Sequence, residues 1–280
     1  ASRGAAFAFR AHERRAWTLP ALVANGTVSP LAAGLLSVAV ERGCAILVVG
    51  PRGAGKTTLL GAMLWELPPT VRTVVIEDAP ELPLEALQAR GRDVQGLRAA
   101  TGETEIEPAE ALRTALRLGD GALVVGEVRG AEAGVLYEAM RVGANSEAVL
   151  GTIHGTDGSA VRDRVVEDLD VPPASFGATD AIVSLEFDES GDGQPRRVRS
   201  VEEVQSGGET FADLLTRTGS GLEPTGRLQR GNSDLLARLA DPGETYADVL
   251  SAIENSRDHL RTLARTGRTG PGDLEPGAIE

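Results

Sequence analysis

One short stretch constrains the fold of this chain more than any other. Residues 48–64 read VVGPRGAGKTTLLGAML, and Gly50 to Thr57 within them match the pattern G-x-x-x-x-G-K-[ST]. An apolar run, Ala45 to Gly50, precedes the pattern, and a segment with helical character, Gly55 to Leu67, follows it. In that context the pattern predicts a buried parallel strand, a phosphate-binding loop and a helix, in that order.

The residue types of this loop suit an anionic ligand. Glycines allow the backbone to curl so that successive N–H groups point at phosphate oxygens, and the following helix adds its positive end. Lys56 is the only lysine among 28 basic residues, and its slim ammonium fits between phosphates where a planar guanidinium would fit poorly. Thr57 offers a hydroxyl to Mg²⁺. The expected nucleotide-binding residues are Gly50, Arg52, Gly53, Ala54, Gly55, Lys56, Thr57 and Thr58.

Strands and helices alternate along the next part of the chain, which predicts an α/β fold with a mostly parallel central sheet flanked by helices. Pro68-Pro69 ends the helix after the loop. Further strands are expected at Val71–Asp78, Ala122–Glu127, Ala148–Ile153, Asp180–Phe187 and Val198–Val204, and helices at Leu31–Arg42, Pro108–Leu118, Ala131–Val142 and Ser159–Leu169.

The composition changes after residue 204. Phe211–Arg217, Ser233–Leu239 and Tyr246–Leu263 have amphipathic helical spacing. We therefore expect a linker or remnant of an upstream domain at 1–18, an ATPase-type domain at 19–204, a small helical C-terminal subdomain at 205–264 and a flexible tail at 265–280.

Charge and composition exclude several kinds of partner. A net charge of −13 argues against a broad surface for nucleic acid or anionic membrane, and 3% aromatic residues argue against base-stacking platforms. The longest apolar window, 31–50, contains Glu41 and Arg42, so no direct membrane span is expected. The single cysteine, Cys44, permits no internal disulfide and fits a reducing compartment.

The acid surplus has two interpretations, an ordinary cytosolic protein or a protein adapted to high salt. We favour the halophile interpretation, in which carboxylates keep the surface hydrated. The use of arginine in place of lysine is compatible with salt adaptation, with a GC-rich genome, or with both.

Polar side chains stand at the ends of the predicted strands. Glu77 and Asp78 end one strand, Glu127 ends another two residues before Arg129, and His154 ends a third. Carboxyl ends of parallel strands border the crevice in which ligands bind. Glu127 is expected to position Mg²⁺ with Thr57, and Glu77 to orient or activate the attacking water. The alternative for these acids is to cap helices or bind loop amides, and we expect Asp78 to have such a structural role.

Four motifs stand in one order: the loop around Lys56, VVIEDAPEL, LVVGEVRGAEAGVLYEAM and LGTIHGTDGSA. This order closely resembles the type II/type IV secretion ATPase family, the motors of pilus and archaellum assembly and of secretion, over roughly Leu19 to Glu186. The resemblance implies a RecA-like P-loop NTPase core that uses ATP and Mg²⁺. It also implies that Glu77 and Glu127 serve water activation and metal positioning, that Arg129 supports the turn after Glu127, and that His154 is the histidine-box residue.

The resemblance carries further expectations about assembly. Members typically form homohexameric rings with ATP near subunit boundaries, and act at the cytoplasmic face of the cell membrane on an integral membrane platform protein. By this resemblance we expect most of an N-terminal domain to be absent from the given sequence, which leaves Arg10, Arg14 and Arg15 as the candidates for the arginines that the family draws from that region. Gly119-Asp120-Gly121 and Gly143-Ala144 depart from the family pattern and bear on the subfamily more than on the activity. The segment after Val204, which the common motifs do not cover, together with the acidity resembles archaeal members of the family.

Three functions remain open from the sequence. The first is a ring-shaped ATP-hydrolysing motor for filament assembly or secretion. The second is a catalytically weak nucleotide-binding regulator or scaffold of such a system. The third is a nucleic-acid translocase, which the acid surplus and the scarcity of aromatic residues disfavour.

Overall fold

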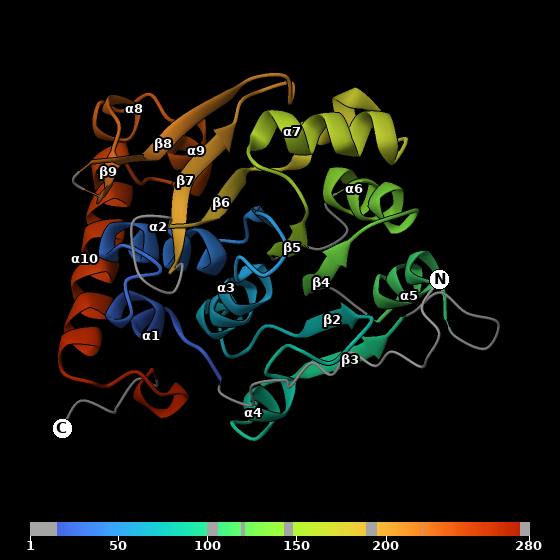
Figure 1. The fold of residues 1–280 in the computed structure, drawn as a ribbon, viewed down its shortest axis with the longest axis horizontal. Coiled ribbons are helices and arrows are strands. Elements are labelled where there is room, and N and C mark those ends of the chain that lie inside the picture. Colours follow the sequence, from blue (N-terminus) through green and yellow to red (C-terminus); the bar gives the residue numbers. More distant parts are fainter. Residues whose placement is uncertain are drawn as a thin grey trace, which may run out of the picture.

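A single sheet runs through the part of the chain that the computed structural model describes, which comprises residues 16–99, 106–118, 121–142, 148–188, 195–219 and 221–274. In these residues nine strands hydrogen-bond in the order β3-β2-β4-β5-β1-β6-β7-β8-β9 (Figure 1). The first six strands of that order are parallel. They are β1 (Ala45–Val49), β2 (Thr73–Glu77), β3 (Val94–Arg98), β4 (Ala122–Val128), β5 (Val149–Ile153) and β6 (Ala181–Phe187).

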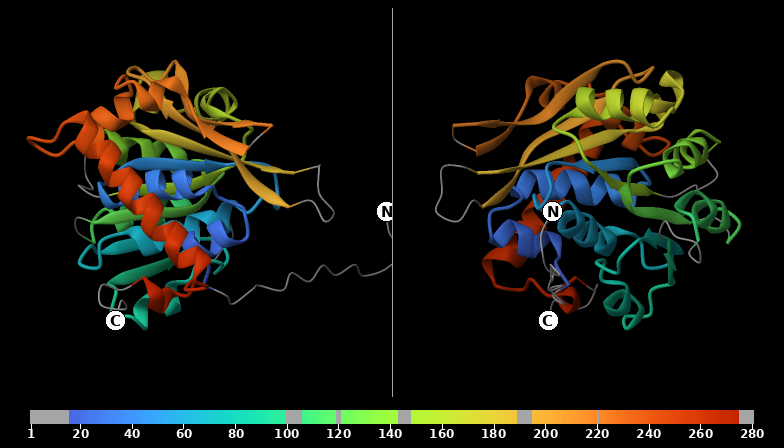
Figure 2. Two further views of the ribbon diagram at one scale, coloured as in Figure 1. Left: turned by 90° about the vertical axis from the view of Figure 1, so that its left-hand side faces the viewer. Right: turned by 45° about the vertical axis from the view of Figure 1, so that its right-hand side comes forward.

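Helices cover both faces of this parallel part, which confirms the predicted α/β architecture (Figures 1 and 2). The alternation of β1 shows how: Ile46 and Val48 face one apolar cluster, and Leu47 and Val49 face the other. One face carries α1 (Leu19–Ala24), α2 (Pro30–Glu41), α3 (Lys56–Met63) and α10 (Tyr246–Arg265), and the other carries α5 (Pro108–Ala115), α6 (Glu132–Val142) and α7 (Gly158–Asp163).

Short elements complete this core. The sequence did not predict β3 or the small α4 (Leu84–Gln88), which lie between β2 and α5 in the chain. A 3-10 turn (Leu64–Glu66) extends α3, a π-helical turn (Arg164–Asp168) extends α7, and a second 3-10 turn (Pro173–Ala178) leads into β6.

An antiparallel part extends the sheet beyond β6. It consists of β7 (Arg196–Val204), β8 (Phe211–Thr218) and β9 (Gly221–Pro224). The expectation of a helix at Phe211–Arg217 was therefore wrong. The register skips Leu214, since Val201 pairs with Leu215 and Glu202 with Asp213. Because of this bulge, both Leu214 and Leu215 point inward and are fully buried. The apolar residues of the strand therefore do not alternate with polar ones, and their spacing in the sequence resembles that of a helix.

Three helices follow the sheet, α8 (Gly226–Gln229), α9 (Asp234–Leu239) and α10, and the last two agree with prediction. Gly34 of α2 lets α10 approach closely, because a Cβ there would lie 2.6 Å from the carbonyl oxygen of Ile253. After a last 3-10 turn (Pro271–Asp273), Leu274 packs on the core, and Thr18 donates a hydrogen bond to the Thr269 carbonyl at 2.7 Å.

Some expectations fall outside the described residues. Arg10, Arg14 and Arg15 lie there, as do Gly119-Asp120, Gly143-Ala144 and the last six residues of the tail. The division into domains stays a prediction, although the sheet continues across the expected boundary at residue 204. Within the described ranges, no helix combines the length and the apolar character that a membrane crossing requires.

The carboxyl of Glu66, beside the end of α3, gives the fold a pH dependence. Burial raises the pKa of Glu66 from 4.5 to about 7, while a hydrogen bond from Ser37 Oγ at 2.6 Å opposes the rise. Because the folded chain binds this proton more tightly than the unfolded chain, the stabilisation is complete below pH 4.5 and is lost as the pH rises through about 7.

We therefore expect Glu66→Gln to raise the melting temperature at about pH 8 and to change it little at about pH 4.5. The amide keeps an acceptor for Ser37 and does not titrate. Scanning calorimetry of both proteins across pH measures the difference, with Glu85→Gln on the exposed surface of α4 as the control. A melting difference that is independent of pH would contradict the assignment.

Candidate functional site

The carboxyl ends of four neighbouring strands, β2, β4, β5 and β1, border one cleft of about 470 Å³. Because β5 lies between β1 and β4, His154 stands between the glycine-rich loop and Glu127. The cleft brings together most of the residues that the sequence singled out. Its lining includes Arg52, Gly53, Gly55, Lys56, Thr57, Thr58, Glu77, Asp78, Glu127, Arg129 and His154.

The loop after β1 has the backbone shape that its glycines allow. Gly53 and Gly55 have φ of +83° and +96°, values that residues with a Cβ rarely adopt. A Cβ at Gly50 would lie 2.7 Å from the Leu185 carbonyl oxygen, so β6 packs directly on the start of the loop. Ala54 is fully buried beneath the loop, and α3 begins at Lys56 with Gly55 as its N-cap. The amide groups of the first turn of α3 are therefore directed at the cleft.

Lys56 is held at the bottom of the cleft. Its side chain is only 7% exposed, and Nζ donates to the carbonyl oxygens of Gly50 at 3.0 Å and Pro51 at 3.2 Å. Burial lowers the pKa of Lys56, while the nearby Glu127 carboxylate raises it. The ammonium is thus kept in place by its own loop and faces a carboxylate across the cleft.

A chain of polar contacts joins Lys56 to the Glu127 side of the cleft. His154 Nδ1 lies 3.4 Å from Lys56 Nζ, and His154 Nε2 lies 2.9 Å from Glu127 Oε1. Arg129 pairs with the other oxygen of Glu127 and, at 2.8 Å, with Asp78 Oδ2. One imidazole therefore contacts both the ammonium of the loop and the carboxylate at the end of β4.

A bulge in β4 presents Glu127 to the cleft. The pairing of β4 with β5 shifts between Val125 and Val128, so Gly126 and Glu127 leave the regular ladder. Thr152 of β5 replaces the missing ladder bond by donating to the Gly126 carbonyl at 2.7 Å. Glu132 fixes the following turn, because its Oε1 accepts from the amides of Arg129 and Gly130 at 2.6 and 2.9 Å.

Glu77, at the end of β2, is fixed by the backbone of the next loop. It is 9% exposed, and its Oε1 accepts from the amides of Glu81 and Leu82, both at 2.9 Å. Burial raises the pKa of Glu77, and these two hydrogen bonds oppose the rise. Asp78 accepts from the Ala79 amide and pairs with Arg129, which is the kind of hydrogen-bonding role expected of it.

The donors that line the cleft suit Mg²⁺ bound together with phosphates. Within the described residues, no group of three or more His, Cys, Asp or Glu side chains is arranged to hold a metal by itself. Mg²⁺ commonly uses one or two protein oxygen ligands and takes the rest from phosphates and water. The Thr57 hydroxyl and the Glu127 carboxylate, both in the lining, are oxygen donors of that kind.

Arg196 also lines this cleft, and no pattern in the sequence pointed to it. Arg196 begins β7, and its Cδ would lie 3.4 Å from a Cβ at Gly55, so its stem covers the loop. Its charge adds to those of Arg52 and Lys56 on the same side of the cleft. Arg196 reaches the loop only because β1 pairs with β6 and β6 pairs with β7. Such long-range pairings leave no local pattern in the sequence around Arg196.

Comparisons with known proteins confirm the family that the order of the motifs resembles. The family model described as "Type II/IV secretion system protein" matches residues 1–178. A putative conjugal transfer protein of Mycobacterium tuberculosis is 39% identical over 170 residues, which are 59% of this chain and 46% of that protein. An uncharacterised protein of Methanocaldococcus jannaschii is 30% identical over 254 residues, 88% of this chain and 91% of the other.

Solved structures give the same result for the fold. The VirB11 ATPase of the Brucella suis type IV secretion system, solved with sulphate, has a TM-score of 0.51 and 25% identity, and the match covers 60% of this chain and 50% of that one. The Legionella pneumophila ATPase DotB has a TM-score of 0.55 at 16% identity and supports the fold alone, over 91% of this chain and 60% of its own. The chain spans about half the length of the Mycobacterium relative and of VirB11. With more than half of its residues matched by the family model, the chain belongs to the type II/IV secretion system protein family.

Proposed function

We propose that this protein hydrolyses ATP with Mg²⁺ and powers a secretion or filament-assembly machine of the type IV pilus or archaellum kind. The observation that carries the proposal is the contact line from Lys56 through His154 to Glu127, which joins the phosphate-binding loop to a carboxylate at the end of β4. A lysine, a hydroxyl and a carboxylate converging on a loop of inward amides match the parts that phosphoryl transfer requires.

Each residue of the cleft has a distinct task in this proposal. The amides of residues 53–58 and the Lys56 ammonium bind the phosphate chain, and Thr57 and Glu127 hold Mg²⁺, which neutralises charge on the phosphates. Glu77, held by two amides, and Glu127 orient the attacking water and accept its proton. His154 holds Glu127 and Lys56 at a fixed separation, and Arg129 fixes the other oxygen of Glu127.

The setting of the motor is part of the same proposal. By analogy with the family, we infer a homohexamer at the cytoplasmic face of the membrane that works against an integral membrane platform protein. The acid surplus supports adaptation to high salt. Activity measurements therefore need a series of potassium chloride concentrations.

Lys56→Ala tests the nucleotide site directly. Without the ammonium we expect binding of a fluorescent ATP analogue to weaken by about a hundredfold, in line with the ~1.5–3 kcal/mol of hydrogen bonds to charged groups. Equilibrium titration measures the affinity, and a coupled phosphate-release assay measures turnover. Arg90→Ala, on the loop after α4, is the control. Unchanged affinity in the Lys56 variant would contradict nucleotide binding at this loop.

Two alternative functions make different predictions in the same assays. A catalytically weak regulator or scaffold would bind the nucleotide through Lys56 and show little turnover at any salt concentration. A nucleic-acid translocase would show turnover that DNA stimulates, which the charge of −13 disfavours.

A further inference from the structure

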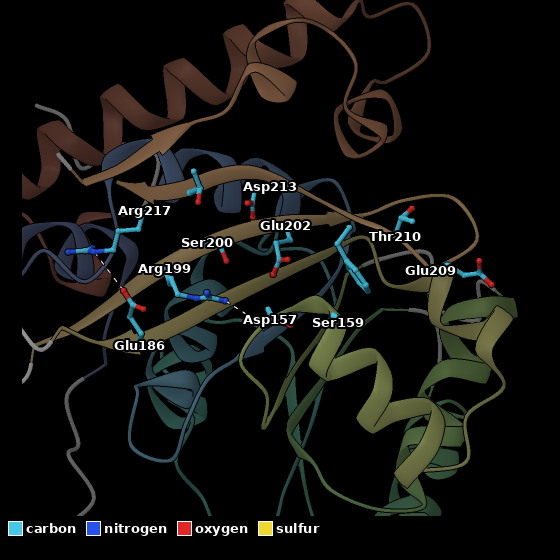
Figure 3. Close-up of a pocket in the computed structure, with 12 residues that line it drawn as sticks. Asp157, Ser159, Glu186, Arg199, Ser200, Glu202, Glu209, Thr210, Asp213 and Arg217 are labelled. Atoms are coloured by element: carbon cyan, nitrogen blue, oxygen red, sulfur yellow. Dashed lines mark ion pairs between the residues drawn. The ribbon is translucent and has the colours of Figure 1, made fainter. Parts of the chain in front are cut away.

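A second concave site lies between β7, β8 and the start of α7, apart from the nucleotide cleft. Its volume is about 830 Å³ (Figure 3). We call it the β7–β8 groove, and the lining residues that matter here are Asp157, Arg199, Ser200, Glu202, Phe211 and Asp213. The strand pairing brings these residues together, and none of them belongs to the nucleotide cleft.

Like charges face each other in this groove. Glu202 of β7 is paired directly with Asp213 of β8 in the strand register. Carboxylates directly opposite each other destabilise a sheet. Burial, the strongest influence, raises the pKa of Glu202, and the charges of Asp213 and Asp157 add to the rise. The hydrogen bond from the Gly158 amide and the charge of Arg199 oppose it. The groove therefore concentrates negative charge that the fold itself does not favour.

The two arginines of the groove form their ion pairs with other carboxylates, among them Asp157 and Glu186 of the same lining. Arg199 Nη2 donates to the Thr156 carbonyl at 2.8 Å and lies 3.9 Å from Asp157. Arg217 contacts Glu186 at 3.7 Å and Asp188 at 3.2 Å. Among the residues that the structure describes, no basic side chain lies within ion-pair distance of Glu202 or Asp213, although the more distant charge of Arg199 lowers the pKa of both.

The opposite face of β7 carries a second glutamate, Glu203, which does form an ion pair with an arginine. Glu203 is fully buried, and it pairs with Arg227 while Ser233 Oγ and the Leu235 amide donate to it at 2.5 and 3.1 Å. Glu202 likewise accepts from a backbone amide, that of Gly158 at 3.1 Å, and has a serine beside it in the lining. What the Glu203 site has and the Glu202 site lacks, within the described residues, is a guanidinium within ion-pair distance.

Ser200 supplies an independent indication of a ligand. It is 5% exposed, and its hydroxyl has no hydrogen-bond partner among the described residues. Figure 3 shows it on the groove wall between Arg199 and Glu202. A buried hydroxyl without a partner is costly, and an N–H donor in the groove would satisfy it.

The shape of the groove also suits a long cationic side chain. The Phe211 ring lies against the first turn of α7, where a Cβ at Gly158 would come within 2.4 Å of it. An aromatic face beside carboxylates receives the stem and the planar head of an arginine. A bulge in the pairing of β6 with β7 leaves Arg199 without a residue opposite it in the strand register, and bulges of this kind re-aim side chains beside binding sites.

We propose that the β7–β8 groove binds an arginine side chain of a partner protein, with Glu202 and Asp213 pairing with the guanidinium, Ser200 accepting from it and Phe211 covering its stem. A bare metal ion is a poorer occupant, because no group of three or more His, Cys, Asp or Glu side chains in the described part of the chain is arranged to hold a metal by itself. The site does not depend on nucleotide hydrolysis.

The test uses a fluorescein-labelled peptide with two arginines spaced by alanine, and the same peptide with citrulline in their place. Citrulline keeps the shape and removes the charge. In fluorescence anisotropy titrations with the full chain, we expect the arginine peptide to bind about tenfold more tightly or better, the scale of one charge-assisted contact. Equal binding of the two peptides, or no binding of either, would overturn the proposal.

Paired variants locate the contact. Glu202→Gln/Asp213→Asn should abolish the preference for arginine, while Glu85→Gln/Glu110→Gln, with the same net charge, should keep it. Because the first pair removes opposed charges, its melting temperature should equal or exceed that of the wild type, and Asp213→Asn alone provides a milder variant. A folded groove variant that keeps the full preference would refute the assignment.

Discussion

Glu127→Gln should bind ATP with nearly wild-type affinity and lose turnover by about a hundredfold or more, the scale at which a general base contributes to catalysis. The amide is the same size as the carboxylate, so His154 and Arg129 keep a neighbour at the end of β4. It carries no charge for Mg²⁺ and accepts no proton from water. Binding is measured with a fluorescent ATP analogue, and turnover by phosphate release.

Glu138→Gln provides the matched control for this variant. Glu138 lies on α6, pairs with Arg141 on the exposed surface and loses the same charge outside the cleft. Turnover in the Glu127 variant equal to that of the control would remove Glu127 from the catalytic role. A loss of binding together with turnover would instead assign Glu127 to holding the nucleotide.

Arg227→Met should destabilise the protein by about 3 kcal/mol, the low end of the range for breaking a buried ion pair, because the Arg227 side chain is 24% exposed. The variant leaves the Glu203 carboxylate fully buried with two hydrogen bonds and no cation. Urea denaturation at neutral pH, followed by circular dichroism, measures the free energy of unfolding.

Two further variants separate the ion pair from simple packing. Arg141→Met removes an exposed pair and should cost no more than about 0.5 kcal/mol. Arg227→Met/Glu203→Gln removes both charges and should recover part of the loss, because no uncompensated charge remains buried. A double variant as unstable as Arg227→Met would show that the loss comes from the methylene packing of Arg227.

Local patterns in the sequence were sufficient for the parallel strands except β3, which is mostly exposed. The apolar runs before Gly50, Glu77 and Glu127 are buried on both faces, so each reads as a strand without knowledge of its neighbours. The order of the strands then brings Glu77, Glu127 and His154 to one cleft, as their positions at strand ends predicted.

The antiparallel part was not predictable in the same way. The bulge at Leu214 removes the alternation that identifies a strand. Arg196 reaches the glycine-rich loop through two strand pairings, and Glu202 meets Asp213 through another, so neither contact leaves a local pattern. Long-range register, rather than composition, decides which side chains meet there.

The burial of the only lysine has a practical consequence for measuring the folding of this chain. A protease specific for lysine has a single cutting site in the sequence, after Lys56, and in the native fold that residue is 7% exposed at the start of α3. Cleavage then reports opening of the phosphate-binding loop or global unfolding, and it yields only residues 1–56 and 57–280. The lysine that lines the cleft is therefore also a reporter of how often the loop opens.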